Sequence, residues 1–136
     1  MPFKVFVSHG SHDSWIARQM ARCIGDIPGA TTFLDVFDIQ TGDDFRRRIS
    51  DEIAGSEEMV VLLTPFSMRR TWLMNEIGLA WGLRKRIVPI LFGMTAADMD
   101  GGDAGGRGVL EPAHFRGLNE FDAYLRELEG RIGDAG

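Results

Sequence analysis

The stretch MVVLL at positions 59–63 decides the fold, because it is the strongest strand signal in the chain. It shows no alternation of polar and apolar residues, and a turn with the sequence TPFS follows at 64–67. A short continuous run of aliphatic residues is typical of a parallel strand that is covered on both faces. We therefore expect a central strand of a parallel sheet here.

Strand signals and helix signals alternate outward from this stretch. Further strands are expected at 3–8, 31–34, 86–92 and 114–118, and helices at about 14–25, 45–55, 71–83 and 120–132. The order predicts an α/β fold, a flavodoxin-like open parallel sheet of about five strands with helices on both faces, because parallel crossovers are right-handed. Pro89 cannot donate a ladder hydrogen bond, so its strand should lie near a sheet edge or carry an irregularity.

The length of the chain limits the number of domains, and its net charge disfavours some classes of binding partner. The chain has 136 residues and a net charge of −5. We expect one domain at 1–133, with a glycine-rich loop at about 93–112 and a frayed tail or the start of a linker at 134–136. The acidic balance disfavours a nucleic-acid or membrane surface, and the run RRR at 46–48 is interpreted as a solvated helix face. No secretory signal or membrane-spanning segment is apparent, so a cytoplasmic location is expected.

Cysteine and motif content exclude several chemistries. The single cysteine, Cys23, falls in an apolar stripe with Ile16, Met20 and Ile27, and we expect a buried structural thiol. No cysteine or histidine spacing suits a metal site, so no metal is expected. The sequence has no Rossmann glycine motif, no P-loop and no serine elbow of a hydrolase.

Polar turns follow the first three expected strands, at 8–13, 35–43 and 64–67. Ligands bind at the carboxyl ends of the strands in parallel sheets, so these turns are where a site is expected. Asp13 or Ser14 should cap the helix that follows the first turn.

Glu76 is placed unusually within the expected helix at 71–83. At about 100° per residue, Glu76 falls between Leu83 and Ala80, inside the apolar arc of the helix. The helix begins at the carboxyl rim of the sheet, so Glu76 is a candidate functional residue. An ordinary helix acid that faces solvent or pairs with an arginine is the alternative.

Six segments in order resemble a Toll/interleukin-1 receptor (TIR) domain of the bacterial type. The resemblance covers about residues 3–132, and its most specific element is the tryptophan in WLMNEI with a glutamate four residues on. The segments are VFVSHGSHD at 5–13, FLDVFDIQTGD at 33–43, the helix and strand at 49–65, WLMNEI at 72–77, RIVPI at 86–90, and HFRGLNEFDAYL at 114–125.

The resemblance implies an enzyme that cleaves NAD⁺ between ribose and nicotinamide, giving ADP-ribose or a cyclised variant as a signal in anti-phage defence. NAD⁺ is then a substrate and no cofactor is needed. Glu76 takes the place of the family's catalytic glutamate, and a carboxylate there can stabilise an oxocarbenium-like state. Trp72 and Leu83 could supply an apolar wall. The alternative is a non-catalytic module that signals by homotypic assembly.

The resemblance also implies roles for residues of the polar turns. Ser8 and His9 would line the substrate pocket, although helix capping or turn stabilisation explains them equally well. Trp72 would contact substrate or only pack in the core. Asp38 and Asp43 would contact substrate or a neighbouring copy, or merely form a solvated acidic loop.

The family's mobile BB loop corresponds to 35–43. Asp35, Ile39 and Gly42 are expected to belong to an assembly loop, through which one copy completes the site of the next. Partners are therefore expected to be other TIR domains, with a sensor or effector that is fused or separate.

Overall fold

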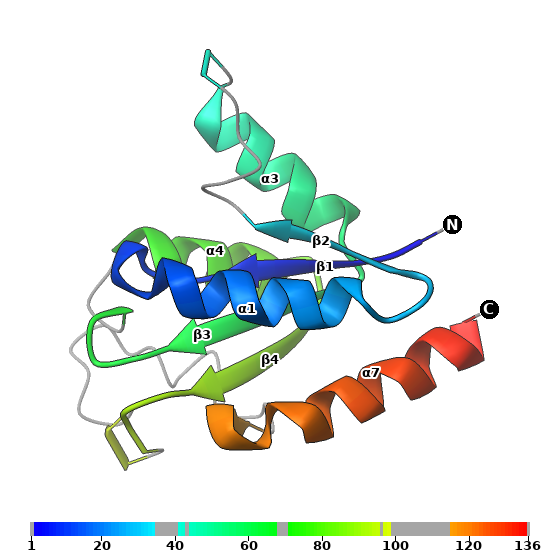
Figure 1. Cartoon of the computed structure of the whole chain (residues 1–136). Coiled ribbons are helices and arrows are strands. Elements are labelled where there is room, and N and C mark those ends of the chain that lie inside the picture. Colours follow the sequence, from blue (N-terminus) through cyan, green and yellow to red (C-terminus); the bar gives the residue numbers. More distant parts are fainter. Residues whose placement is uncertain are drawn as a thin grey trace.

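The computed structural model describes residues 2–34, 41–42, 44–67, 71–95, 97–98 and 115–135, without the side chains of 71 and 72. Strands and helices alternate in the expected order (Figure 1). The elements are β1 (Phe3–Ser8), η1 (Ser11–Asp13), α1 (Ser14–Gly25), β2 (Ala30–Leu34), α3 (Phe45–Gly55), β3 (Glu58–Leu63), α4 (Thr71–Gly82), β4 (Arg86–Leu91), β5 (Arg116–Gly117), η3 (Leu118–Glu120) and α7 (Phe121–Ala135).

The sheet has five strands in the order β2-β1-β3-β4-β5, and every neighbouring pair is parallel. This confirms the flavodoxin-like arrangement expected from the sequence. All six residues of β3 are buried, as the unbroken apolar run at 59–63 predicted. The chain runs from β1 outward to β2 and then returns to place β3 on the other side of β1, which creates a topological switch point at β1.

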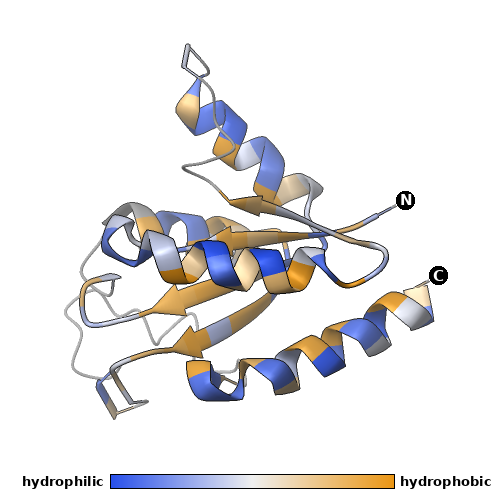
Figure 2. Ribbon diagram, in the orientation of Figure 1, coloured by the Kyte–Doolittle hydropathy of each residue, from blue (hydrophilic) through white to orange (hydrophobic). Residues whose placement is uncertain are grey.

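Two hydrophobic clusters cover the two faces of the sheet. Val5 and Val7 of β1 join the cluster packed under α1 and α7, while Phe6 joins the cluster under α3 and α4. Figure 1 shows α1 and α7 in front of the strands, and Figure 2 shows the strands as the most apolar part of the chain. Truncating a fully buried strand residue such as Leu62 to alanine is expected to cost about 2–5 kcal/mol of stability.

β5 is short and covers only the end of β4. Its two residues pair with Ile90 and Leu91, so within the described chain Pro89 lies where β4 has no neighbour on that side. The expectation that this strand lies near a sheet edge is confirmed. Most of the expected glycine-rich loop, at 99–112, lies outside the described residues.

Cys23 differs from the sequence-based expectation, because its thiol is exposed and not buried. The buried side chains of α1 are Ala17, Met20, Ala21 and Ile24. Cys23 lies beside this buried stripe, on the exposed surface of the helix. Its helical spacing from apolar residues therefore predicted its burial wrongly.

Candidate functional site

The carboxyl ends of β1 and β3 lie side by side, and the polar turns after them form one edge of the molecule. Ser8 and His9, at the end of β1, are fully buried, and Thr64 at the end of β3 is nearly so. Since polar side chains are seldom buried without partners, their hydrogen bonds show what these turns position.

Glu76 lies on the buried face of α4, together with Leu73, Ile77 and Ala80, and only 6% of its surface is exposed. The helical spacing therefore placed this carboxylate correctly, and a solvent-facing acid is ruled out. The Ser8 hydroxyl donates a hydrogen bond of 2.7 Å to Glu76 Oε1. This bond joins the end of β1 to α4 and fixes the direction of the carboxylate.

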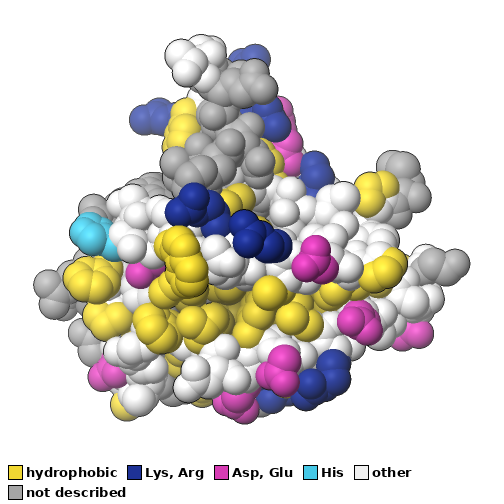
Figure 3. Space-filling view, in the orientation of Figure 1, with side chains coloured by type: hydrophobic (Ala, Val, Ile, Leu, Met, Phe, Trp, Pro, Cys, Tyr) yellow, Lys and Arg dark blue, Asp and Glu magenta, His cyan; other side chains and the backbone are white. Residues whose placement is uncertain are grey.

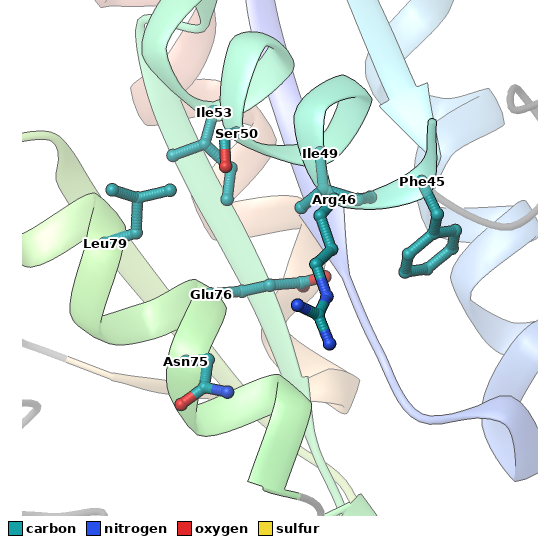
Figure 4. A pocket seen from close by; sticks show the side chains of 8 residues that line it. All are labelled: Phe45, Arg46, Ile49, Ser50, Ile53, Asn75, Glu76 and Leu79. Atoms are coloured by element: carbon teal, nitrogen blue, oxygen red, sulfur yellow. The ribbon is translucent and has the colours of Figure 1, made fainter. Parts of the chain in front are cut away.

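An open pocket of about 560 Å³ lies between α3 and α4, and the Glu76 side chain projects into it (Figure 4). Carbon atoms from both helices make its wall, and polar groups are few. Its lining residues are Phe45, Arg46, Ile49, Ser50, Ile53, Asn75, Glu76 and Leu79. A concave apolar surface with a few convergent polar groups is the usual form of a small-molecule site.

The wall of this pocket differs from the one expected. Leu83 does not line it and is 43% exposed. α4 ends at Gly82, and Arg84 adopts a φ of 59°, which turns the chain back toward β4. Leu83 thus lies at the far end of α4 from the carboxyl rim, and the wall comes from α3 and Leu79 instead. The side chain of Trp72 lies outside the described part of the structure.

His9 is buried beside Ser8 but does not line the pocket. Burial lowers the pKa of its imidazole below the ordinary value of 6.5, while a hydrogen bond with the Val7 backbone and the Asp13 carboxylate act in the opposite direction. His9 is therefore neutral near pH 7, as desolvation of the charged form requires. It supports the turn behind Ser8 and is not among the residues that face the pocket.

Asp13 joins the two turns that flank Ser8. Thr64 Oγ1 donates a hydrogen bond of 2.7 Å to Asp13 Oδ2. Asp13 occupies the N-cap position of α1 without a capping hydrogen bond from its side chain, and the Ser14 hydroxyl donates to the Ser11 carbonyl. The expectation that either side chain caps α1 is therefore wrong, because these polar groups have partners in and between the turns.

Gly10 allows the two turns to approach closely. A Cβ at this position would lie 3.3 Å from Cβ of Ser67, closer than side chains ordinarily pack. Ser67 in turn accepts a hydrogen bond of 2.8 Å from the Thr64 amide, which closes the turn at 64–67. The close approach at Gly10 and the hydrogen bond from Thr64 to Asp13 thus hold the two turns together beside Ser8.

Several predicted site residues lie outside the described part of the chain. They are Asp35, Asp38, Ile39 and Asp43. Gly42 is described, in a turn with a φ of 95°, which L-residues rarely adopt. Of the predicted site residues, the structure brings Ser8 and Glu76 into contact. His9 lies beside Ser8 and outside the pocket lining. Gly42 adopts a backbone conformation that favours glycine.

The α3 side of the pocket was not anticipated from the sequence. The sequence predicts a solvated face for Arg46, yet this residue lines the pocket with Ser50 and Ile53. Residues spaced i, i+4 and i+7 share one helix face, so this spacing was the signal available. Among the described residues no group of three or more His, Cys, Asp or Glu could hold a metal ion.

A family model described as "TIR domain" matches residues 5–128. A curated relative from Brucella abortus (strain 2308), described as "Probable 2' cyclic ADP-D-ribose synthase TcpB", is 29% identical over 93 residues. The aligned region is 65% of this chain but 37% of the relative. The chain thus matches little more than a third of that protein.

Solved structures share the fold. A metazoan TIR-STING receptor from C. gigas aligns with a TM-score of 0.72 at 20% identity, over 90% of this chain and 38% of that one. The TIR domain of the Toll-related receptor TRR-2 from Hydra magnipapillata aligns with a TM-score of 0.70 at 18% identity, over 94% and 96% of the two chains. At these identities the likeness establishes the five-stranded parallel architecture.

Proposed function

Because the chain belongs to the TIR domain family, we propose that it is an enzyme that cleaves NAD⁺ between ribose and nicotinamide, with Glu76 as the catalytic carboxylate. The observation that carries this proposal is the buried Glu76 side chain, held by Ser8 and projecting into an open pocket. Burying an acid costs stability, and a buried acid that projects into a cavity is a candidate for a functional residue.

The chemistry suits a lone carboxylate. The bond between the ribose C1′ and the nicotinamide nitrogen breaks, and its electron pair leaves with nicotinamide as a neutral base. No strong acid is required, so the chemistry does not depend on a histidine among the described lining residues. The carboxylate stabilises the positive charge that develops on the ribose and can accept hydrogen bonds from its hydroxyls.

The electrophilic C1′ is then captured by an oxygen nucleophile. Water gives ADP-ribose and a proton, while a hydroxyl of the same molecule gives a cyclic product and a proton. The apolar side chains of Ile49, Ile53 and Leu79 lower the local dielectric, which strengthens the interaction between Glu76 and the developing charge. The description of the Brucella relative supports a product of the cyclic ADP-ribose type.

Trp72 is proposed as a further substrate contact, with Asp38 and Asp43 as contacts from the segment that precedes α3 in the sequence. Asp35, Ile39 and Gly42 belong in this proposal to the loop through which copies assemble. We also propose that assembly activates the enzyme, and that it acts in the bacterial cytoplasm in anti-phage signalling. Sensor or effector partners would then act through this assembly.

A second candidate function is a non-catalytic module that signals by assembly alone. Large apolar side chains on the surface favour it: Trp15 is 65%, Phe66 61% and Trp81 59% exposed. Figure 3 shows apolar side chains gathered in a band between α1 and α7. Exposed apolar area of this kind marks contact surfaces.

Mass spectrometry of NAD⁺ reactions separates these functions. The protein is incubated with NAD⁺ over a range of concentrations, up to those at which it self-associates. Release of nicotinamide with linear or cyclic ADP-ribose supports the enzyme. Intact NAD⁺ under every assembling condition supports the module.

A further inference from the structure

Arg46 faces the candidate carboxylate across the pocket. It lies in the first turn of α3 and lines the same cavity as Glu76, which projects from α4. Figure 4 shows the Arg46 side chain extending away from α3 and toward Glu76. The pocket therefore presents one cationic and one anionic side chain, with apolar side chains around them.

Arg46 is not used to hold the described structure together. Its neighbour Arg48 pairs with Glu52 at 3.1 Å and lies over the Phe33 ring at 5.3 Å. Arg131 pairs with Glu58 at 2.9 Å. Among the described residues, no hydrogen bond or ion pair is found for the Arg46 guanidinium. An arginine that lines a pocket without such a partner is available to a ligand.

The two charges suit a ligand that carries both signs. The Ser8 hydroxyl orients the Glu76 carboxylate, which can face a cationic sugar-base centre in the pocket. A guanidinium presents planar paired donors that match the oxygens of a phosphate. A ligand with a cationic nucleoside and a phosphate on the same sugar carries both of the charges that the pocket would bind.

We infer that Arg46 binds a phosphate group of the substrate and makes the Glu76 pocket selective for phosphate-bearing nicotinamide nucleotides over the phosphate-free riboside. This rests on the proposed function and extends it to the substrate's anionic part. Arg46 is then a residue of substrate binding, separate from the bond-breaking role of Glu76. Its loss should weaken substrate binding more than it slows the chemical step.

Arg47 provides a matched control. It is the next residue of α3, is also exposed, and does not line the pocket. Arg46→Gln and Arg47→Gln remove the same charge from adjacent surface positions, so both variants should fold. A difference in substrate affinity between the two variants is then due to the position of Arg46 in the pocket, because both variants lose the same charge.

Steady-state kinetics with NAD⁺ and nicotinamide riboside test the inference. Arg46→Gln is expected to raise KM for NAD⁺ about ten- to a hundred-fold with little change in kcat, the effect of losing a hydrogen-bonded charge pair. Cleavage of the riboside, and both reactions of Arg47→Gln, should match the wild type. Equal KM values for NAD⁺ in the two variants, while the wild type cleaves NAD⁺, would overturn the role of Arg46 and leave the proposed function intact.

Binding of ADP-ribose tests the same point without catalysis. Nitrogen-15 NMR titrations of wild type, Arg46→Gln and Arg47→Gln would follow the amides around the pocket. Binding that is lost only in Arg46→Gln supports the inference even if NAD⁺ is not cleaved, in which case the proposed function alone fails. Unchanged binding in Arg46→Gln, or no binding to the wild type at millimolar ADP-ribose, overturns the inference.

Discussion

The Ser8 hydroxyl and the Glu76 carboxylate, 68 positions apart in the chain, are joined by a buried hydrogen bond of 2.7 Å. Parallel pairing of β1 with β3, and the crossing of α4 over the same face, bring them together. The bond links the end of β1, where the sheet has its switch point, to the acid proposed to do the chemistry.

Ser8→Ala should lower kcat for NAD⁺ cleavage about ten-fold with KM nearly unchanged, because it removes one hydrogen bond to a charged group and loosens the carboxylate. Steady-state nicotinamide release measures both constants. Ser11→Ala, in the exposed turn after β1, is the control and should leave them unchanged. An unchanged kcat in a folded Ser8→Ala protein would show that the bond does not position Glu76.

His9 should make the folded state less stable in acid. Its pKa is lowered by burial from 6.5, so below this value the unfolded chain binds a proton that the folded chain resists. Stability from this source is complete above about pH 6.5 and declines as the pH falls below it. Urea unfolding of wild type and His9→Gln between pH 5 and 7.5 measures the slopes. A pH dependence that persists unchanged in His9→Gln would assign the effect to other groups.

Arg131→Met should destabilise the protein by about 3–5 kcal/mol, because it leaves a buried carboxylate without its cation. Arg131 Nε and Nη2 each donate a hydrogen bond of 2.9 Å to Glu58, which is 1% exposed, and the Tyr124 hydroxyl donates a third at 2.6 Å. Burial, together with the Glu58 carboxylate, raises the pKa of Tyr124, so its hydroxyl remains a donor. Chemical denaturation of the single variant measures the loss.

The double variant Glu58→Leu/Arg131→Met should recover most of that stability, since it removes both charges. This cluster lies where β3 begins, at the opposite end of the sheet from the pocket. NAD⁺ cleavage by the double variant should therefore match the wild type. A double variant no more stable than Arg131→Met would refute the buried-charge explanation.

Gly42→Ala should weaken concentration-dependent activation. The φ of 95° at Gly42 strains any residue with a Cβ, at a cost of about 1–2 kcal/mol, and the loop before α3 is the proposed assembly loop. Specific activity across a dilution series, with light scattering for mass, measures the effect. Gly55→Ala, at the end of α3 with open space around it, is the control. Equal dilution curves for both variants would exclude an assembly role for Gly42.

The sequence was sufficient for the fold because its apolar runs are short and well separated. The runs at 3–8 and 59–63 became β1 and β3 with bounds within one residue. The burial of Glu76 was predicted from the helical wheel, which places this acid inside the apolar arc of α4. The helix periodicity predicted the buried face of α4 on which Glu76 lies, and the strand order predicted that α4 begins at the carboxyl end of the sheet.

The remaining errors come from tertiary contacts that periodicity does not encode. Asp13 looked like a helix cap, but the Thr64 hydroxyl from another turn is its partner. Arg46 looked solvated because only the packing of α3 against α4 creates the pocket that it lines. Leu83 fell on the expected face of the wheel, but the helix ends before it.

Single-turnover nicotinamide release shows whether Glu76 breaks the nicotinamide–ribose bond. Glu76→Gln keeps the size of the side chain and removes its charge, and Glu129→Gln makes the same change at an exposed position of α7 as a control. At a concentration where the wild type is assembled, Glu76→Gln should be slower by at least about a thousand-fold, as for loss of a main electrostatic group, while Glu129→Gln keeps the wild-type rate. Equal rates for wild type and Glu76→Gln would rule out Glu76 as the catalytic carboxylate.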